Sequence, residues 1–215
     1  MNTEFILRAA KAVHETILAE ESEIESLDRA IGDGDHVINI KRGAAAIVAM
    51  HDELAGLPPD AALQKIGMKL LSTIGGASGP LIAGFFLAMG KAVGERDVEI
   101  PPAGDLNQAA LAFAAGVEAI RNRGKADLGE KTMLDVLIPV SRAFTRLAAA
   151  GVRRAALFDE LDRVAEQGML STRDLIATKG RAAFLGERAI GHIDPGAKTS
   201  QLILRTVCEL ARRAD

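Results

Sequence analysis

The 215-residue sequence predicts an all-α protein, a bundle of about eight antiparallel helices. Apolar residues recur at three- and four-residue steps along most of the chain, which is the period of one helix face. No stretch alternates apolar and polar residues as a half-buried strand does, and there is no internal repeat of fixed period. The helical stretches are joined by short turns except at four glycine-bearing loops.

Apolar stripes and proline positions define the elements of the first third of the chain. Helices are expected over residues 5–17, 21–29, 37–54 and 60–74. Pro58-Pro59 separates the last two of these, because proline cannot continue a helix. Asp60 follows at the place of an N-cap, where its carboxylate would accept a hydrogen bond from the first turn.

The remaining elements are again set by periodicity and by glycine and proline. Helices are expected over residues 81–93, 105–123, 132–150, 152–178 and 197–213. The first of these is apolar on every side and should be buried centrally. Residues 94–104 form a surface connection, and Gly104 or Asp105 caps the helix that follows it. We expect Pro139 to kink its helix and Gly168 to weaken the next one.

The four long loops are expected to meet at one end of the bundle. They are the acidic loop around residues 28–39, Gly75–Gly79, Gly124–Lys131 and Lys179–Gly196. Each loop is separated from the next by two helices, and in an up-and-down bundle such loops lie at the same end. A loop of eighteen residues is also uncommon in a compact domain unless it serves a function. The sequence therefore predicts one site built from four loops.

The acidic loop predicts a divalent-metal site. Asp28, Asp33 and Asp35 lie within eight residues and are followed by His36 and Asn39. Carboxylate oxygens are the ligands preferred by Mg²⁺ and Ca²⁺, and glycine lets the backbone turn so that they converge. The alternative is that two of the aspartates form Asx turns while the third faces solvent. The spacing does not fit an EF-hand, and zinc is disfavoured because no cysteine or second histidine is near.

The other three loops suit phosphate rather than covalent catalysis. Gly75–Gly79 precedes a helix whose free N–H groups can bind an anion, although a tight helix–helix turn is the plainer alternative. Gly124–Thr132 resembles a P-loop but has an inserted residue and no preceding strand. The 179–196 loop offers arginine, which suits bidentate phosphate contacts. A metal, anion-binding amides and an arginine without a nucleophile indicate phosphoryl or nucleotide handling.

Composition excludes several other classes of protein. The net charge is −3 and the chain has no Trp or Tyr, which disfavours nucleic acid as a partner. The single Cys208 favours a reducing compartment. No signal peptide is recognisable, and the most apolar stretch, residues 80–89, is too short to span a bilayer. We therefore expect a cytoplasmic protein with no membrane association.

Several of these motifs, taken in order, resemble the L subunit of dihydroxyacetone kinase (DhaL). The resemblance spans essentially the whole chain and rests on Leu27–Arg29, Ile31–His36, Asn39, Gly75–Pro80, Gly124–Ala126, Gly129–Asp135, Lys179–Ala182, Leu185–Arg188 and Gly191–Ala197. It implies a single domain over residues 1–215. It also implies an eight-helix, barrel-like bundle with a nucleotide at one end.

The resemblance also implies roles for individual residues. Two Mg²⁺ ions that clamp the phosphates of ADP or ATP would be held by Asp28, Asp33 and Asp35. Nucleotide contacts would come from His36, Val37, Ile38, Asn39, Ala77, Ser78, Gly124, Met133, Arg181, Asp194, Pro195 and Gly196. No protein nucleophile is expected on this subunit. The family usually has glycine where this chain has Val37, and a β-branched residue resists positive φ, so the backbone and the phosphate contact there are expected to differ.

The resemblance implies that the reaction is shared between separate proteins, which are the partners of this chain. A separate K subunit holds a small ketose, dihydroxyacetone, through a histidine and receives the phosphoryl group. ADP would either be rephosphorylated in place by a phosphotransferase-system protein (DhaM) or exchange with free ATP, and a stand-alone L unit favours the first. Alternatives are another ketose such as erythrulose, or a non-catalytic paralogue that binds a transcription regulator. A homodimer is left open.

Overall fold

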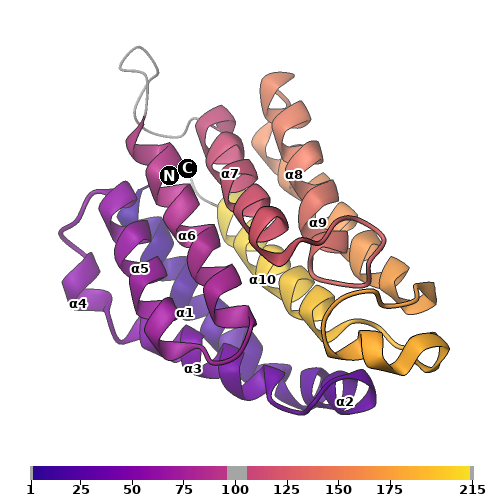
Figure 1. Ribbon diagram of the computed structural model, residues 1–215. Coiled ribbons are helices and arrows are strands. Elements are labelled where there is room, and N and C mark those ends of the chain that lie inside the picture. Colours follow the sequence, from indigo (N-terminus) through magenta and orange to yellow (C-terminus); the bar gives the residue numbers. More distant parts are fainter. Residues whose placement is uncertain (1, 96–105, 214–215) are drawn as a thin grey trace.

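The computed structural model describes residues 2–95 and 106–213, and every regular element in these ranges is helical (Figure 1). The α-helices are α1 (Thr3–Ala19), α2 (Glu21–Ile31), α3 (His36–Val48), α4 (His51–Leu54), α5 (Pro59–Thr73), α6 (Ser78–Gly94), α7 (Leu106–Gly124), α8 (Leu134–Ala149), α9 (Arg154–Ser171) and α10 (Pro195–Arg212). Two 3₁₀ segments are η1 (Thr172–Asp174) and η2 (Arg181–Ala189). The predicted all-α class is confirmed.

Eight of the described helices form a closed ring. Going round it, α1 packs on α3, α3 on α5, and then α6, α7, α8, α9 and α10 follow in chain order until α10 meets α1. Helix α2 lies outside the ring against α3 and α10, and α4 is a single turn in the connection after α3. The ring is the predicted eight-helix, barrel-like bundle. No described helix has the length and apolarity that crossing a bilayer requires.

Aromatic rings form a ladder across four neighbouring helices of the ring. Phe85 on α6 meets Phe113 on α7 with centroids 5.7 Å apart, and Phe113 meets Phe144 on α8 at 6.4 Å. Phe144 then meets Phe158 on α9 at 6.2 Å. Edge-to-face and tilted pairs at these separations are favourable and bury large apolar areas. The ladder holds one wall of the ring together.

Helix α6 is less buried than its sequence predicts. Its apolar side chains, including Leu81, Ile82, Phe85 and Phe86, are mostly half-buried rather than enclosed. The reason is that these four residues line a cavity inside the ring instead of a filled core. A stretch that is apolar on all sides does not distinguish contact with core atoms from contact with an apolar cavity.

Several helix boundaries also differ from prediction. The expected 37–54 helix breaks after Val48, and α4 restarts at His51. Asp60 is not the N-cap of α5; Pro58 is, with Pro59 at the first helical position where a missing N–H costs nothing. The expected 152–178 helix ends at Ser171. The predicted surface connection and the cap at Gly104 or Asp105 lie outside the described residues, apart from the first residues of that connection.

The two positions expected to disturb their helices both lie inside helices that continue past them. Helix α8 contains Pro139 without ending there. Gly168 is a contact point, because a Cβ at this position would lie 2.4 Å from the backbone oxygen of Asp135. The missing side chain lets α9 approach the backbone of α8 closely.

Candidate functional site

One end of the ring opens into a cavity of about 1010 Å³. All four predicted loops line its mouth, with Asp33, Ser78, Gly124 and Arg181 as representatives of each. In Figure 1 this end lies where the loop before α8 and the loop before α10 approach the start of α6 and the end of α2. Loops that are far apart in sequence therefore meet at one place, as the count of helices between them predicts.

The acidic loop brings its three carboxylates together. Asp28 lies buried in the last turn of α2, whereas Asp33 and Asp35 are exposed in the turn that follows. One oxygen from each of the three lies within 4.8 Å of the others. Gly34 allows this turn with φ of 81°, a conformation that side-chain-bearing residues rarely adopt. Oxygen donors in this arrangement fit Mg²⁺.

The electrostatics of the acidic loop also favour a cation. The pKa of Asp35 is raised, first by burial and then by the charge of Asp33, with a smaller effect of Asp28. Asp28 is held in place by the backbone N–H of His36, which donates to its Oδ2 at 2.9 Å. Three carboxylates that repel one another are relieved by a divalent ion between them. The close approach of three carboxylates that repel one another is the observation that a Mg²⁺ site explains.

Two helix N-termini present free N–H groups beside the carboxylates. Helix α3 begins at His36, and neither Val37 nor Ile38 donates its backbone N–H to a protein acceptor in the described residues. Helix α6 begins at Ser78, and no side chain caps it. Helix N-termini favour anions through these N–H groups and through the helix dipole. Phosphate groups bound to a metal at the acidic loop would meet both.

Asn39 joins the two phosphate-suited elements. Its Oδ1 accepts a hydrogen bond from the backbone N–H of Gly75 at 3.3 Å, and its side chain also hydrogen-bonds to the Asp35 carboxylate. The residue is buried beneath the cavity mouth. Its role in the structure is therefore to fix the Gly75–Gly79 loop relative to the acidic loop.

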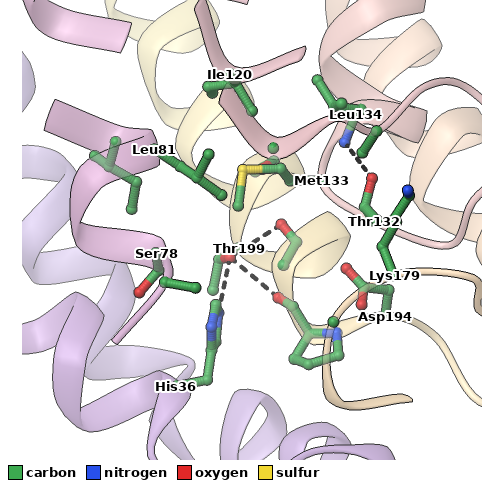
Figure 2. A pocket seen from close by; sticks show the side chains of 18 of the residues that line it. His36, Ser78, Leu81, Ile120, Thr132, Met133, Leu134, Lys179, Asp194 and Thr199 are labelled. Carbon is green, nitrogen blue, oxygen red and sulfur yellow. Dashed lines mark hydrogen bonds between the residues drawn. The ribbon is translucent and has the colours of Figure 1, made fainter. Parts of the chain in front are cut away.

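The His36 ring is hydrogen-bonded to α10. Its Nε2 lies 3.1 Å from Thr199 Oγ1, and that hydroxyl also lies 3.0 Å from the carbonyl of Pro195 (Figure 2). The same hydroxyl lies 3.1 Å from the carbonyl of Gly196; if it donates its proton to one of these carbonyls, the Nε2–H of His36 donates to the hydroxyl oxygen. Burial lowers the pKa of His36, against smaller opposing effects of Asp28 and Asp35.

The cavity also has an apolar wall. Leu81, Ile120 and Met133 come from α6, α7 and the start of α8, and all line the cavity (Figure 2). Phe85 and Phe113 continue this surface deeper into the ring. A flat, largely apolar ring system attached to phosphates would be accommodated with its ring on this wall.

Arg181 crosses the mouth toward the acidic loop. Its Nε lies 2.7 Å from Asp33 Oδ2, and both side chains are well exposed to solvent. The segment that carries it is held on α2 by a small cluster in which Ala182 and Ala189 pack with Ile31. The predicted arginine and the predicted metal ligand are thus immediate neighbours.

Asp194-Pro195-Gly196 opens α10 as the sequence predicts. Asp194 is the N-cap and accepts a hydrogen bond from the N–H of Ala197 at 2.7 Å, with Pro195 at the first helical position. The pKa of Asp194 is raised to about 7, mainly by burial and to a smaller extent by the nearby charge of Asp135. Hydrogen bonds from backbone N–H groups and the charge of Lys131 act in the opposite direction.

This raised pKa predicts how Asp194 affects stability with pH. Between about pH 4 and pH 7 the folded chain holds a proton that the unfolded chain releases, so the free energy of unfolding falls as pH rises through that window. Asp194→Asn keeps the N-cap acceptor but removes this titration. We expect the variant to gain stability relative to the wild type between pH 4 and pH 8, by on the order of 1 kcal/mol or more. Urea unfolding of the wild type and the variant at pH 4 and at pH 8 measures this. A difference in the free energy of unfolding between the two proteins that is the same at both pH values would refute it.

Most of the predicted site residues lie round the cavity. Its lining includes Asp28, Asp33, Asp35, His36, Ala77, Ser78, Gly124, Met133, Arg181, Asp194, Pro195 and Gly196. Val37, Ile38 and Asn39 do not line it. The side chain of Val37 is buried with Ile24 and Leu202, and its backbone is ordinary helix, so the expected conflict with a positive φ does not arise.

Two residues at the site were not singled out from the sequence. Thr199 is hydrogen-bonded to the ring of His36, and Lys131 is a cavity-lining lysine that is only 1% exposed. Thr199 follows Pro195 by four residues, so the prediction of a helix opening at Asp194 could have placed it on the same face. Lys131 is the lysine of the P-loop-like pattern in Gly124–Thr132, but that pattern does not predict that its side chain is buried.

Comparisons with known proteins place this arrangement in context. The model of the DAK2 domain family matches residues 30–209. The ADP-binding subunit DhaL of PEP-dependent dihydroxyacetone kinase 1 from Listeria innocua is 37% identical over 206 residues, covering 96% of both chains. Its counterpart from Escherichia coli is 37% identical over 198 residues, covering 92% of this chain and 91% of that one.

A solved structure has the same fold. The dihydroxyacetone kinase from C. freundii, in complex with AMP-PNP and Mg²⁺, superposes with a TM-score of 0.70 and 26% sequence identity. The match covers 94% of this chain and 33% of that one, so this chain spans about a third of the length of the larger kinase.

Proposed function

The chain belongs to the DAK2 domain family, and from this premise we propose that it is the nucleotide- and Mg²⁺-binding L subunit of a dihydroxyacetone kinase. The observation that carries the proposal is the cluster of Asp28, Asp33 and Asp35 beside two uncapped helix N-termini. The near full-length similarity to ADP-binding DhaL subunits supports the same function.

The aspartates, the helix N-termini and the apolar wall at the mouth would each bind a different part of the nucleotide. We assign two Mg²⁺ ions to the three aspartates, and these ions would neutralise phosphate charge and orient the terminal phosphate. The N–H groups at the starts of α3 and α6 would bind phosphate oxygens, and the apolar wall with Met133 would hold the base. Catalysis of this kind consists of positioning and charge neutralisation, and requires no nucleophile on this chain.

Arg181 is expected to exchange partners when nucleotide binds. Asp33 then coordinates metal, and the guanidinium 2.7 Å away is free to contact phosphate. We expect Arg181→Ala to weaken Mg-ADP binding about tenfold, because a hydrogen bond to a charged group contributes about 1.5–3 kcal/mol. The thermal midpoint should hardly change, since an exposed ion pair contributes little.

Calorimetric titration of Arg181→Ala with ADP and Mg²⁺ measures this effect. Arg188→Ala is the matched control, because that arginine lies exposed on the same 3₁₀ segment and does not line the cavity. Equal affinity for the wild type and Arg181→Ala would remove Arg181 from the nucleotide site.

The phosphoryl acceptor is expected on another protein. We propose a K subunit that carries dihydroxyacetone, with the mouth of the ring facing it so that the terminal phosphate reaches the ketose. The similar subunits are named as parts of PEP-dependent or PTS-dependent kinases, which supports DhaM as the protein that recharges bound ADP. A kinase for another ketose, such as erythrulose, would use the same mouth, because the acceptor is chosen by the K subunit.

Reconstitution tests the function and identifies the donor. The chain is mixed with a K subunit and dihydroxyacetone, once with ATP and once with phosphoenolpyruvate and the phosphotransferase-system proteins. Formation of dihydroxyacetone phosphate with the second donor alone is the expected result. Formation with ATP alone would assign the exchange scheme, and no product with either donor, despite nucleotide binding, would favour the regulatory paralogue.

A further inference from the structure

Lys131 is a buried cation that the proposed function does not use. Its side chain is only 1% exposed, and among the described residues its ammonium forms no ion pair with a carboxylate. Its backbone has φ of 59°, in the left-handed region that residues other than glycine rarely adopt. A buried charge and a strained backbone each cost free energy, so the surrounding structure must hold this residue for a reason.

The ammonium of Lys131 is satisfied entirely by main-chain carbonyls. Nζ donates to the carbonyls of Thr172 at 2.5 Å and His192 at 2.6 Å, with a longer contact to Arg173 at 3.4 Å. A lysine ammonium has three donors that point in different directions, which suits three carbonyls arranged around it. Burial lowers the pKa of Lys131, while the charges of Asp194, Asp174 and Asp135 raise it.

These carbonyls belong to the two ends of one functional segment. Residues 174–191, here called the Arg181 loop, leave the ring after Arg173 and return to it just before His192. The N–H of Gly191 donates to the carbonyl of Arg173 at 2.8 Å and closes the base of the loop. Lys131 holds that base, because it binds the carbonyls that follow the end of α9 at Ser171 as well as the carbonyl of His192.

The same anchor fixes the start of α10. Thr172 accepts a hydrogen bond from the N–H of Asp194 at 3.1 Å through its Oγ1, so the residue whose carbonyl binds Lys131 also holds the N-cap of α10. Thr178, near the start of the Arg181 loop, donates its hydroxyl hydrogen bond to Oε1 of Glu130, the residue before the lysine, at 2.8 Å. Contacts of this dipeptide with Thr172, Arg173, His192 and Thr178 thus join the loop before α8 to both flanks of the loop before α10.

We propose that Lys131 is a positioning residue for nucleotide binding, which sets Arg181 and Asp194–Gly196 relative to the side of the mouth that carries Met133. This inference rests on the proposed function, since it deepens the same site. The Arg181 loop is held at its base by Lys131, near its start by Glu130 and farther along by the packing of Ala182 and Ala189 on Ile31, so a shift of the base changes where Arg181 lies. Burying the Lys131 ammonium costs free energy. In return, it holds the base of the Arg181 loop firmly, and without it the Arg181 guanidinium would lie away from the phosphates.

Lys131→Met tests the proposal, with Lys125→Met as the matched control. Lys125 lies in the same loop, also has a positive φ of 47°, and is exposed. We expect Lys131→Met to weaken Mg-ADP binding about 10- to 100-fold, as loss of an outer partner does at other sites, with phosphoryl transfer at saturating nucleotide reduced far less. The control should bind as the wild type does. Wild-type affinity in Lys131→Met would overturn the proposal.

A double-mutant cycle separates positioning from general stabilisation. If Lys131 acts through Arg181, then Lys131→Met costs much less affinity in the Arg181→Ala background than in the wild type. The same fold loss in both backgrounds would contradict action through Arg181. Should Lys131→Met not fold, Lys131→Arg keeps the charge but cannot direct a planar guanidinium at three carbonyls, and is expected to bind nucleotide several-fold more weakly. A folded Lys131→Arg with full affinity would overturn the proposal.

Hydrogen exchange without nucleotide distinguishes this proposal from the function on which it rests. The Lys131→Met variant should exchange faster at the N–H of Gly191 and at Asp194, while α5 and α6 stay protected. That result supports the anchor even if the wild type binds no nucleotide. Unchanged exchange in the variant contradicts the anchor whatever the protein binds.

Discussion

Replacing Asp33 and Asp35 together by asparagine is expected to abolish Mg²⁺-dependent nucleotide binding while leaving the fold at least as stable. Both side chains are exposed, and with Asp28 they place an oxygen each within 4.8 Å of the others. The amide oxygens keep the shape but remove two of the three charges that attract the ions. The affinity for Mg-ADP should fall by more than about 100-fold, which exceeds the usual cost of losing an outer-shell partner.

The effect on stability should have the opposite sign. Without a cation the carboxylates repel, and the pKa of Asp35 is raised by burial and by Asp33. The double variant relieves this repulsion and loses only the exposed Arg181–Asp33 pair, so its thermal midpoint should be equal or higher. Asp52→Asn, an exposed aspartate on α4, is the control for a simple change of charge. Unchanged Mg-ADP binding in the double variant would refute the metal site.

Gly168→Ala is expected to cause a large loss of stability at the crossing of α8 and α9. The new Cβ would lie 2.4 Å from the backbone oxygen of Asp135 and 2.9 Å from the Cα of Val136. Backbone atoms cannot move aside as a flexible side chain can, so the helices must separate. We expect a cost of about 1–3 kcal/mol or more, less the small gain in helix propensity from alanine.

The displacement should also reach the site. Asp135 accepts hydrogen bonds from the N–H groups of Gly129 at 2.5 Å and Thr132 at 2.8 Å, and so shapes the loop that carries Lys131. Gly84→Ala is the matched control, because the nearest atom to its new Cβ is 4.0 Å away. The control should gain up to about 1 kcal/mol. Urea unfolding of both variants is the measurement, and a Gly168→Ala protein as stable as the wild type would contradict the close crossing.

The sequence predicts the ring and the meeting of its loops because both depend on local pattern. A helix shows itself through one apolar stripe, and the number of helices between two loops decides whether they share an end. The cluster of carboxylates in the acidic loop could be predicted from local sequence too, because Asp28, Asp33 and Asp35 are close along the chain as well as in space. Residues whose neighbours come from one short segment are those that a single sequence places well.

What the sequence does not predict depends on partners distant along the chain. Helix α9 ends at Ser171, and the carbonyl of Thr172 that follows it is bound by Lys131, forty-one residues earlier in the chain. Helix α6 lines a cavity although its apolar sequence indicates a filled core. Thr199 becomes part of the site only when α10 brings it to His36, 163 residues away. The periodic pattern of apolar residues in the sequence does not indicate contacts of this kind.

Calorimetric titration of the nucleotide-free chain with ADP tests the central claim most directly, once with Mg²⁺ present and once with the metal removed by EDTA. Three aspartates that have a single arginine beside them, Arg181 next to Asp33, still carry excess negative charge and cannot hold polyphosphate unless a further cation intervenes. The account predicts tight binding with Mg²⁺ and at least about 100-fold weaker binding without it. Absence of ADP binding with Mg²⁺, or the same affinity in EDTA, would contradict it.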